Sequence, residues 1–173
     1  WGKGGDFLYR WGNPQNYGRG NSTTQVTFAQ HSVNWVQQGY PGVGNILIYN
    51  NGVTQNVPDI QGRSSIIEIS APMNEQNEYI INDNEPYGPQ TFDWFYNGGD
   101  EFEFLSIIQG GAFRLPNGNT IITTAGNIMT TAENPTIFEV NLQGNIEWSI
   151  LMGATGIARA QKYGYDYFTS QLL

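Results

Sequence analysis

Gly44-Asn45-Ile46-Leu47-Ile48, followed by Ile66-Ile67-Glu68-Ile69, is a pattern that the chain contains twice. The second copy is Gly118-Asn119-Thr120-Ile121-Ile122, followed by Ile137-Phe138-Glu139-Val140. Segments that recur in the same order at a similar spacing are typical of repeat architectures. Each copy is a pair of short apolar runs, the first of them entered through a Gly-Asn turn. Such units are typical of the blades of a β-propeller.

A third segment, with an aromatic residue at its fifth position, occurs at 5–9, 90–94 and 144–148. Residues 6–11 alternate around Phe7, Tyr9 and Trp11, which predicts a half-buried strand. Short β-type runs between Gly, Asn and Pro turns predict the other strands. These are 31–36, 45–50, 64–70, 91–96, 105–115, 119–124, 136–141 and 145–151, with 78–81 as a further candidate.

This order of strands predicts an all-β fold built from propeller blades. We expect the closing strand of a preceding blade at 1–12, blades at 13–97 and 98–152, and a tail at 153–173. Two blades cannot close a ring, and they would leave long exposed edges. The chain is therefore expected to be part of a larger propeller or to complete one by assembling with other chains, and the first alternative is favoured.

Composition excludes several classes of protein. The net charge is −8 with only seven Lys and Arg, so the basic surface of a nucleic-acid-binding protein is missing. There is no Cys, and the Asp residues do not follow a calcium-loop pattern, so neither a metal site nor a cofactor is predicted. No apolar run approaches the roughly 18 residues that a membrane-spanning helix needs.

Five segments, in the expected order and over nearly the whole chain, resemble the arylsulfotransferase (aryl-sulfate sulfotransferase-like) propeller family. They are residues 5–14, 30–35, 41–48, 114–120 and 159–163 with Asp166-Tyr167. The resemblance implies the C-terminal part of a six-bladed propeller, exported to the periplasm or the cell exterior. It also implies transfer of a sulfuryl group from a phenolic sulfate ester to a phenol, without a nucleotide donor.

The only His in the chain, His31, is the first candidate catalytic residue. A neutral His can act as a nucleophile, and the resemblance implies that it faces the funnel of the propeller. The alternative is a hydrogen-bonded residue at the end of a strand. Arg114 is the second candidate, because a guanidinium matches sulfonate oxygens, although it could equally be a surface Arg paired with a carboxylate. The predicted substrate-binding residues are Asn34, Arg19, Arg159, Trp35 and Tyr17.

The family enzymes use more than one His in the funnel. The repeat spacing predicts the counterpart of His31 near Ile108 and Gln109, and neither residue is His. Two functions therefore stay open. One is a sulfotransferase that uses His31 with Arg114 and Arg159. The other is a non-catalytic extracellular propeller that serves as a binding or structural module, partnered by further blades or copies. A lectin-like propeller would need an aromatic pocket in each blade, and the loops of the two blades differ too much for that.

Overall fold

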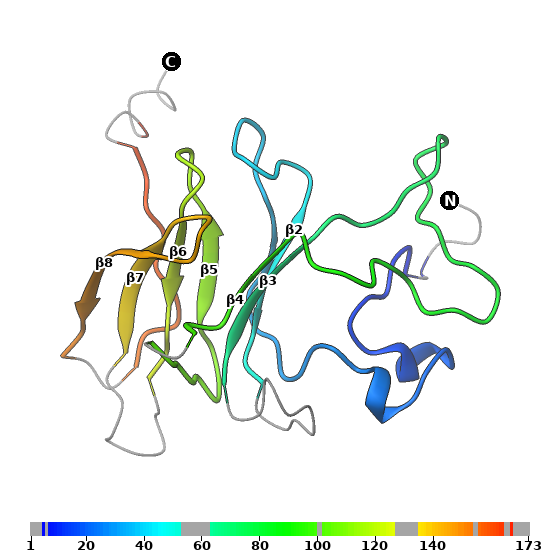
Figure 1. The fold of residues 1–173 in the computed structure, drawn as a ribbon, viewed down its shortest axis with the longest axis horizontal. Coiled ribbons are helices and arrows are strands. Elements are labelled where there is room, and N and C mark those ends of the chain that lie inside the picture. The colour runs from blue at the N-terminus through cyan, green and yellow to red at the C-terminus, as the bar shows by residue number, and fades with distance from the viewer. Residues whose placement is uncertain are drawn as a thin grey trace.

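The computed structural model describes residues 5, 7–52, 63–99, 102–126, 135–153, 156–164 and 167, and it contains two four-stranded antiparallel sheets (Figure 1). The first sheet has the order β1 (Val33–Trp35), β2 (Ile46–Asn50), β3 (Ser65–Ile69) and β4 (Trp94–Tyr96). The second has the order β5 (Gly111–Arg114), β6 (Thr120–Thr123), β7 (Thr136–Val140) and β8 (Ile146–Leu151). Two short 3-10 helices, η1 (Pro14–Tyr17) and η2 (Ser22–Thr24), precede the first sheet.

The prediction of an all-β fold is confirmed, and each of the eight main predicted runs contains one of these strands. Two further strand predictions were wrong. Residues 7–11 form no strand, and around 78–81 there is only an isolated bridge between Met73 and Tyr79. Among the described residues no helix has the length and apolar character needed to cross a membrane.

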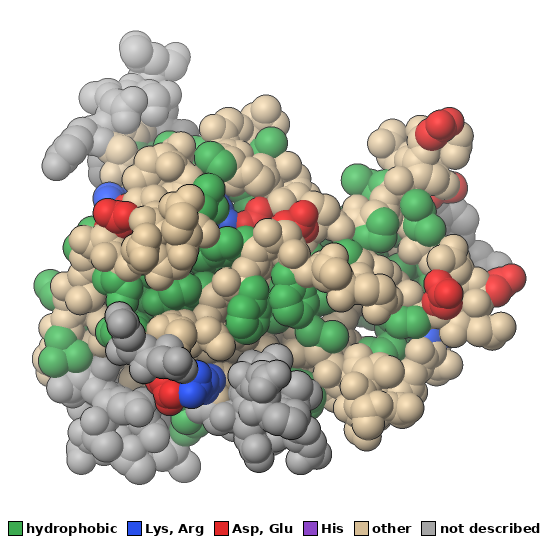
Figure 2. All heavy atoms as spheres, in the orientation of Figure 1, with side chains coloured by type: hydrophobic (Ala, Val, Ile, Leu, Met, Phe, Trp, Pro, Cys, Tyr) green, Lys and Arg blue, Asp and Glu red, His purple; other side chains and the backbone are tan. Residues whose placement is uncertain are grey.

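The main core lies between the two sheets. Leu47 and Tyr49 from β2 pack in one cluster with Ile122 and Phe138 from the second sheet, and all four are fully buried. Side chains alternate between the faces of a strand, so Ile48 points to the opposite face. Figure 2 shows apolar side chains gathered over the sheets with few charged side chains among them.

The opposite face of the first sheet is covered by the N-terminal segment. Tyr9, Trp11 and Val26 pack against a second cluster that contains Ile48 and Ile67. The Tyr9 hydroxyl donates to the Gly88 carbonyl, and Trp11 Nε1 donates to the Pro89 carbonyl at 2.9 Å. Tyr9 and Trp11 therefore pack onto a sheet face while Phe7 stays 73% exposed, and the segment joins no strand, which explains the wrong prediction.

Strand register corrects the predicted counterpart of His31. Val33 pairs with Ile48, and Ala112 pairs with Ile122, the residue that repeats Ile48. Ala112 is thus the counterpart of Val33, and Gly110 is the counterpart of His31. The prediction of Ile108 or Gln109 was wrong because the connection between β1 and β2 is longer than the one between β5 and β6.

Gly110 leaves no room for a second side chain. Its φ is 93°, in the region that favours Gly, and a Cβ there would lie 2.5 Å from the Tyr49 ring. The close approach of Tyr49 therefore excludes His from this position in the second sheet.

The C-terminal segment 156–164 runs beside the second sheet without forming a strand (orange in Figure 1). The Gly110 amide donates to the Ala158 carbonyl at 3.1 Å, and the Ala160 amide donates to Thr123 Oγ1 at 2.9 Å. The segment therefore lies along β5 and β6, on the side away from the first sheet.

Candidate functional site

His31 lies just before β1, with its side chain exposed and its ring orientation fixed. Its backbone amide donates to the Tyr49 carbonyl at 3.1 Å. Nδ1 lies 2.9 Å from the Ala29 carbonyl and 3.0 Å from Asn51 Oδ1. Both neighbours are acceptors, so Nδ1 carries the proton in the neutral ring, and Nε2 presents its lone pair. This tautomer is the one that a nucleophilic imidazole requires.

Asn51 holds this arrangement in place. Its side chain is fully buried, and its Nδ2 donates to the carbonyls of Ser106 at 2.7 Å and Gln109 at 2.8 Å. Because both partners of Nδ2 are acceptors, Oδ1 is the atom directed at His31. The network ties the start of β1 to the segment that precedes β5.

Arg114 ends β5, and its guanidinium is buried between the two sheets. Nη2 forms an ion pair with Glu68 Oε2, Nη1 donates to the Gly118 carbonyl at 2.8 Å, and Cζ lies 4.9 Å from the Trp94 ring centroid. Both charged side chains are at least 95% buried. Burial lowers the pKa of Arg114, and the charge of Glu68 opposes the shift. The positive charge of Arg114 is therefore already compensated inside the protein.

The same set of groups occurs again in the second sheet. Asn45 Nδ2 donates to Glu68 Oε1 at 2.7 Å, and Asn119 Nδ2 donates to Glu139 Oε1 at the same distance. Glu139 also forms an ion pair with Lys162 at 2.8 Å. Each repeat therefore holds one buried glutamate, fixed by the Asn of its own Gly-Asn turn and paired with a cation from the segment that follows.

Burial acts to raise the pKa of Glu139, but hydrogen bonds from Lys162, Asn119 and Trp148 outweigh it and lower the pKa to about 2. Lys162 Nζ also lies 5.8 Å from the centroid of the Trp148 ring, as Arg114 lies over Trp94. Lys162 thus pairs with the second glutamate as Arg114 pairs with the first, but the Lys162 side chain is 52% exposed and the Arg114 side chain is 1% exposed.

The two predicted catalytic residues lie at opposite ends of their strands. Asn34 Nδ2 donates to the Ala112 carbonyl at 2.9 Å, so β1 and β5 lie side by side. The Asn51 side chain contacts both His31 Nδ1 and the Gln109 carbonyl, so His31 lies level with the residues at 109–110, at least four residues before Arg114, and a strand rises about 3.4 Å per residue. His31 and Arg114 are therefore separated by about 14 Å along the strands, too far to act on one sulfuryl group.

Three predicted site residues do come together. Asn34, Trp35 and Arg114 line a cavity of about 410 Å³ that the C-terminal segment completes with Lys162 and Tyr163. Trp35 is 56% exposed, but the Asn34 amide is used by Ala112 and the Arg114 guanidinium by Glu68. This cavity therefore offers the aromatic surface of Trp35, while the guanidinium of Arg114 is already paired with Glu68.

The remaining predicted residues lie elsewhere. Arg19 Nη1 lies 3.3 Å from the Asn82 carbonyl, and the Tyr17 hydroxyl accepts from the Tyr87 amide at 3.1 Å. Both therefore belong to the contact between the N-terminal loop and residues 82–87. Arg159 is exposed beside Gly111, in the C-terminal segment.

Sequence reasoning missed the two buried glutamates and a cavity lined by residues 7–30. The glutamates had a visible signal, because Glu68 and Glu139 are the only charged residues within the two repeated apolar runs. The cavity had none, because it depends on how the N-terminal segment folds onto the first sheet. Within the described part of the chain, no group of three or more His, Cys, Asp or Glu side chains could hold a metal ion.

Comparison of the chain with known protein families, with curated proteins and with solved structures finds no match.

Proposed function

We propose that the chain is a non-catalytic structural and binding module of an extracellular β-propeller, in which successive sheets stack through buried acid–cation contacts. The observation that supports this most directly is the ion pair of Arg114 with Glu68. A sulfonate-binding Arg must offer its charge to the substrate, whereas this guanidinium is buried and paired. Moving it to a substrate would leave Glu68 as an unpaired buried charge, which costs several kcal/mol, about 3–5 in comparable cases.

The second sheet provides a further argument for stacking. Tyr96 on the first sheet is 6% exposed because the second sheet covers it. Its counterpart by register is Ile150, which is 50% exposed, and the neighbouring Trp148 is 38% exposed. The C-terminal segment covers the inner strands of this face but leaves the outer ones bare. The bare outer strands offer a surface for a further sheet, because the first interface uses the equivalent positions of β4.

The stacking role is tested by sedimentation velocity over a range of protein concentrations. We expect the chain to self-associate through the bare face, and Ile150→Lys to abolish the association. Val43→Lys is the matched control, because Val43 is 49% exposed in the connection between β1 and β2 of the first sheet. Association that persists in Ile150→Lys, or a chain that stays monomeric at every concentration, would count against the face as a stacking surface.

A second candidate function, sulfuryl transfer, is favoured by the geometry of His31. Its Nδ1–H is fixed by Ala29 and Asn51, and its Nε2 has no hydrogen-bond partner among the described residues. This is the arrangement of a competent nucleophile, although its partner Arg114 is engaged elsewhere.

One assay separates the two candidates. The purified chain is incubated with p-nitrophenyl sulfate and phenol, and release of p-nitrophenol and formation of phenyl sulfate are both followed. The module proposal expects no transfer above the rate in buffer and an unchanged fold in His31→Ala. Transfer by the wild type that His31→Ala removes, while Val43→Lys retains it, would overturn the proposal in favour of the transferase.

A further inference from the structure

We infer that the cleft beside Trp35 binds a proline-rich peptide in the polyproline II conformation. The cleft combines the cavity of about 410 Å³ that Trp35 and Arg114 line with a second cavity of about 240 Å³. Tyr40, Leu115 and Tyr163 line both cavities, so the two form one depression beside the C-terminal segment. The inference names a ligand for the binding role proposed above and rests on that role, but it does not rest on the stacking face.

The ring of Trp35 is unoccupied. Trp35 is 56% exposed, and no described residue stacks on its ring or accepts a hydrogen bond from its indole N–H. A Trp side chain combines a large apolar surface with one donor, and it is highly buried on average. A second aromatic residue, Tyr163, enters the cleft from the C-terminal segment and is 54% exposed. The cleft therefore offers aromatic surface from two parts of the chain.

The cleft also offers hydrogen-bond donors that no described residue uses. Trp35 Nε1 can donate but cannot accept. The oxygen of the Gln161 amide is taken, since the Tyr163 hydroxyl donates to Oε1, and Nε2 remains as a donor. The hydroxyl of Tyr40 likewise has no hydrogen-bond partner among the described residues. A ligand that fits these groups must bring acceptors.

The charges in the cleft are already compensated. The described lining residues include no Asp or Glu. The guanidinium of Arg114 is paired with Glu68. The ammonium of Lys162 is paired with Glu139 at 2.8 Å. An anionic ligand would have to compete with a carboxylate for either cation, so the cleft favours a neutral ligand.

A proline-rich segment is neutral and rich in acceptors. Proline has a backbone carbonyl but no N–H, so it accepts hydrogen bonds without bringing a donor that needs a partner of its own. Other residues bring one N–H with each carbonyl, and each sugar hydroxyl brings its own proton. The polyproline II helix has no internal hydrogen bonds, so its carbonyls are open to donors. Grooves lined by aromatic residues bind such segments, whose conformation is already ordered.

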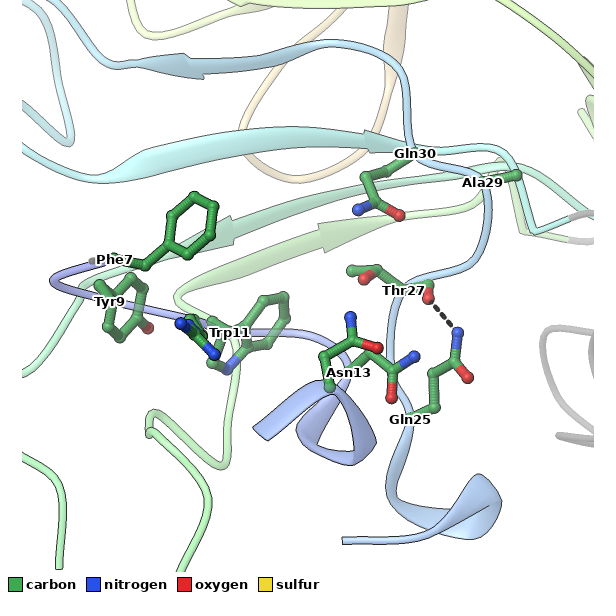
Figure 3. Close-up of a pocket in the computed structure, with 10 residues that line it drawn as sticks. Phe7, Tyr9, Trp11, Asn13, Gln25, Thr27, Ala29 and Gln30 are labelled. Carbon is green, nitrogen blue, oxygen red and sulfur yellow. Dashed lines mark hydrogen bonds between the residues drawn. The ribbon is translucent and has the colours of Figure 1, made fainter. Parts of the chain in front are cut away.

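The chain already holds one of its own prolines with donors of the same kind. Trp11 Nε1 donates to the Pro89 carbonyl at 2.9 Å, and the Tyr9 hydroxyl donates to the Gly88 carbonyl. Figure 3 shows the rings of Tyr9 and Trp11 extending from the N-terminal segment. The cleft presents the same pair of groups, an indole N–H and a Tyr hydroxyl, without a partner from the described residues. A Gly-Pro type of backbone therefore matches donors that this protein uses elsewhere.

The walls of the cleft are joined before a ligand binds. Asn34 Nδ2 donates to the Ala112 carbonyl at 2.9 Å, which ties β1 to β5. The Ala160 amide donates to Thr123 Oγ1 at 2.9 Å, which holds the C-terminal segment against the second sheet. A preformed site lowers the entropic cost of binding.

The test is the fluorescence anisotropy of fluorescein-labelled decaproline titrated with the full chain. Labelled (Gly-Ser)5 is the comparison, because it has the same length but carries N–H groups and no pyrrolidine rings. We expect decaproline to bind saturably and (Gly-Ser)5 not to bind. Trp35→Ala should weaken the binding at least about tenfold. Trp35→Phe and Tyr40→Phe each keep an aromatic ring and remove one donor, so each should weaken the binding about three- to tenfold.

Matched controls separate the cleft from the rest of the molecule. Met73→Ala removes another apolar side chain, 52% exposed and outside the cleft, and should bind as the wild type does. Ile150→Lys should also bind as the wild type does, so a failure of stacking leaves this result unchanged. The module role itself fails in the sedimentation and sulfate-transfer experiments above, whereas this inference fails only in the peptide titration.

Four results would overturn the inference. They are no binding of decaproline, equal binding of (Gly-Ser)5, wild-type affinity in Trp35→Ala, or displacement of the labelled peptide by cellotetraose or p-nitrophenyl sulfate at lower concentration than by unlabelled decaproline. The last result would assign the cleft to a sugar or to an aryl sulfate instead.

Discussion

The buried ion pair between the sheets gives the sharpest prediction. Replacing Glu68 by Gln keeps the shape of the side chain and the hydrogen bond from Asn45, but it leaves the Arg114 charge buried without a counter-charge. The Arg114 side chain is 1% exposed, so water cannot replace the lost partner. Breaking a buried pair by removing one charge costs about 3–5 kcal/mol of the free energy of unfolding.

Equilibrium urea unfolding of Glu68→Gln measures this cost, provided that the slope of the transition is unchanged. Glu103→Gln is the control, because it removes the carboxylate from the ion pair between Glu103 and Arg63. The Glu103 side chain is 53% exposed and the Arg63 side chain is 29% exposed. An exposed pair contributes at most about 1 kcal/mol. If Glu68→Gln lowers stability no more than Glu103→Gln does, the argument that a buried charge pair joins the two sheets is refuted.

Three further predictions concern single groups of the core. The pKa of Glu139 is about 2, below its usual 4.5. The stability that the Glu139 carboxylate contributes is therefore fully present above about pH 4.5 and is lost as the pH falls toward 2. The difference in urea midpoint between the wild type and Glu139→Gln should shrink as the pH falls from 4.5 to 2. Gly110→Ala should cost about 2–4 kcal/mol, because it adds a clash with Tyr49 to the strain of a positive φ, whereas Gly39→Ala, also at positive φ but in open space, should cost about 1 kcal/mol; equal costs in thermal unfolding would contradict the clash. Tyr49→Phe removes the hydrogen bond from Tyr49 to Ser106 Oγ at 2.9 Å and should cost about 1 kcal/mol in urea unfolding, and no loss would mean that the bond adds nothing to stability.

The strands were predictable because each is short, rich in β-branched residues and bounded by turns. The presence of two equivalent sheets also followed from the repeated segments, since the similar sequences at 44–48 and 118–122 form the second strand of the first and of the second sheet. The failure at 7–11 has a physical cause. Alternation of Phe7, Tyr9 and Trp11 predicts one buried side, but it does not reveal whether the backbone pairs with a strand or lies across a sheet face.

The candidate site was less predictable than the fold. The choice of His31 depended on its being the only His, and its contacts with Ala29 and Asn51 could not be foreseen from spacing. Arg114 was predicted to bind an anion because a guanidinium matches sulfonate oxygens, and the sequence does not show which carboxylate faces it. That partner, Glu68, lies 46 positions earlier and meets Arg114 only when the two sheets pack face to face.

The position of the acid–cation contacts determines where this chain can be divided. Glu68 belongs to the first sheet, but its cation comes from β5 of the second, and Glu139 of the second sheet takes its cation from Lys162 beyond β8. A unit in which every buried glutamate has its cation therefore ends one strand later than a unit in which every strand of the first sheet is hydrogen-bonded. A fragment that ends with β4 would keep a whole sheet and yet leave a bare carboxylate at its surface. A fragment extended through Gly118 would carry its own counter-ion, and this later boundary is where an isolated first unit should be cut.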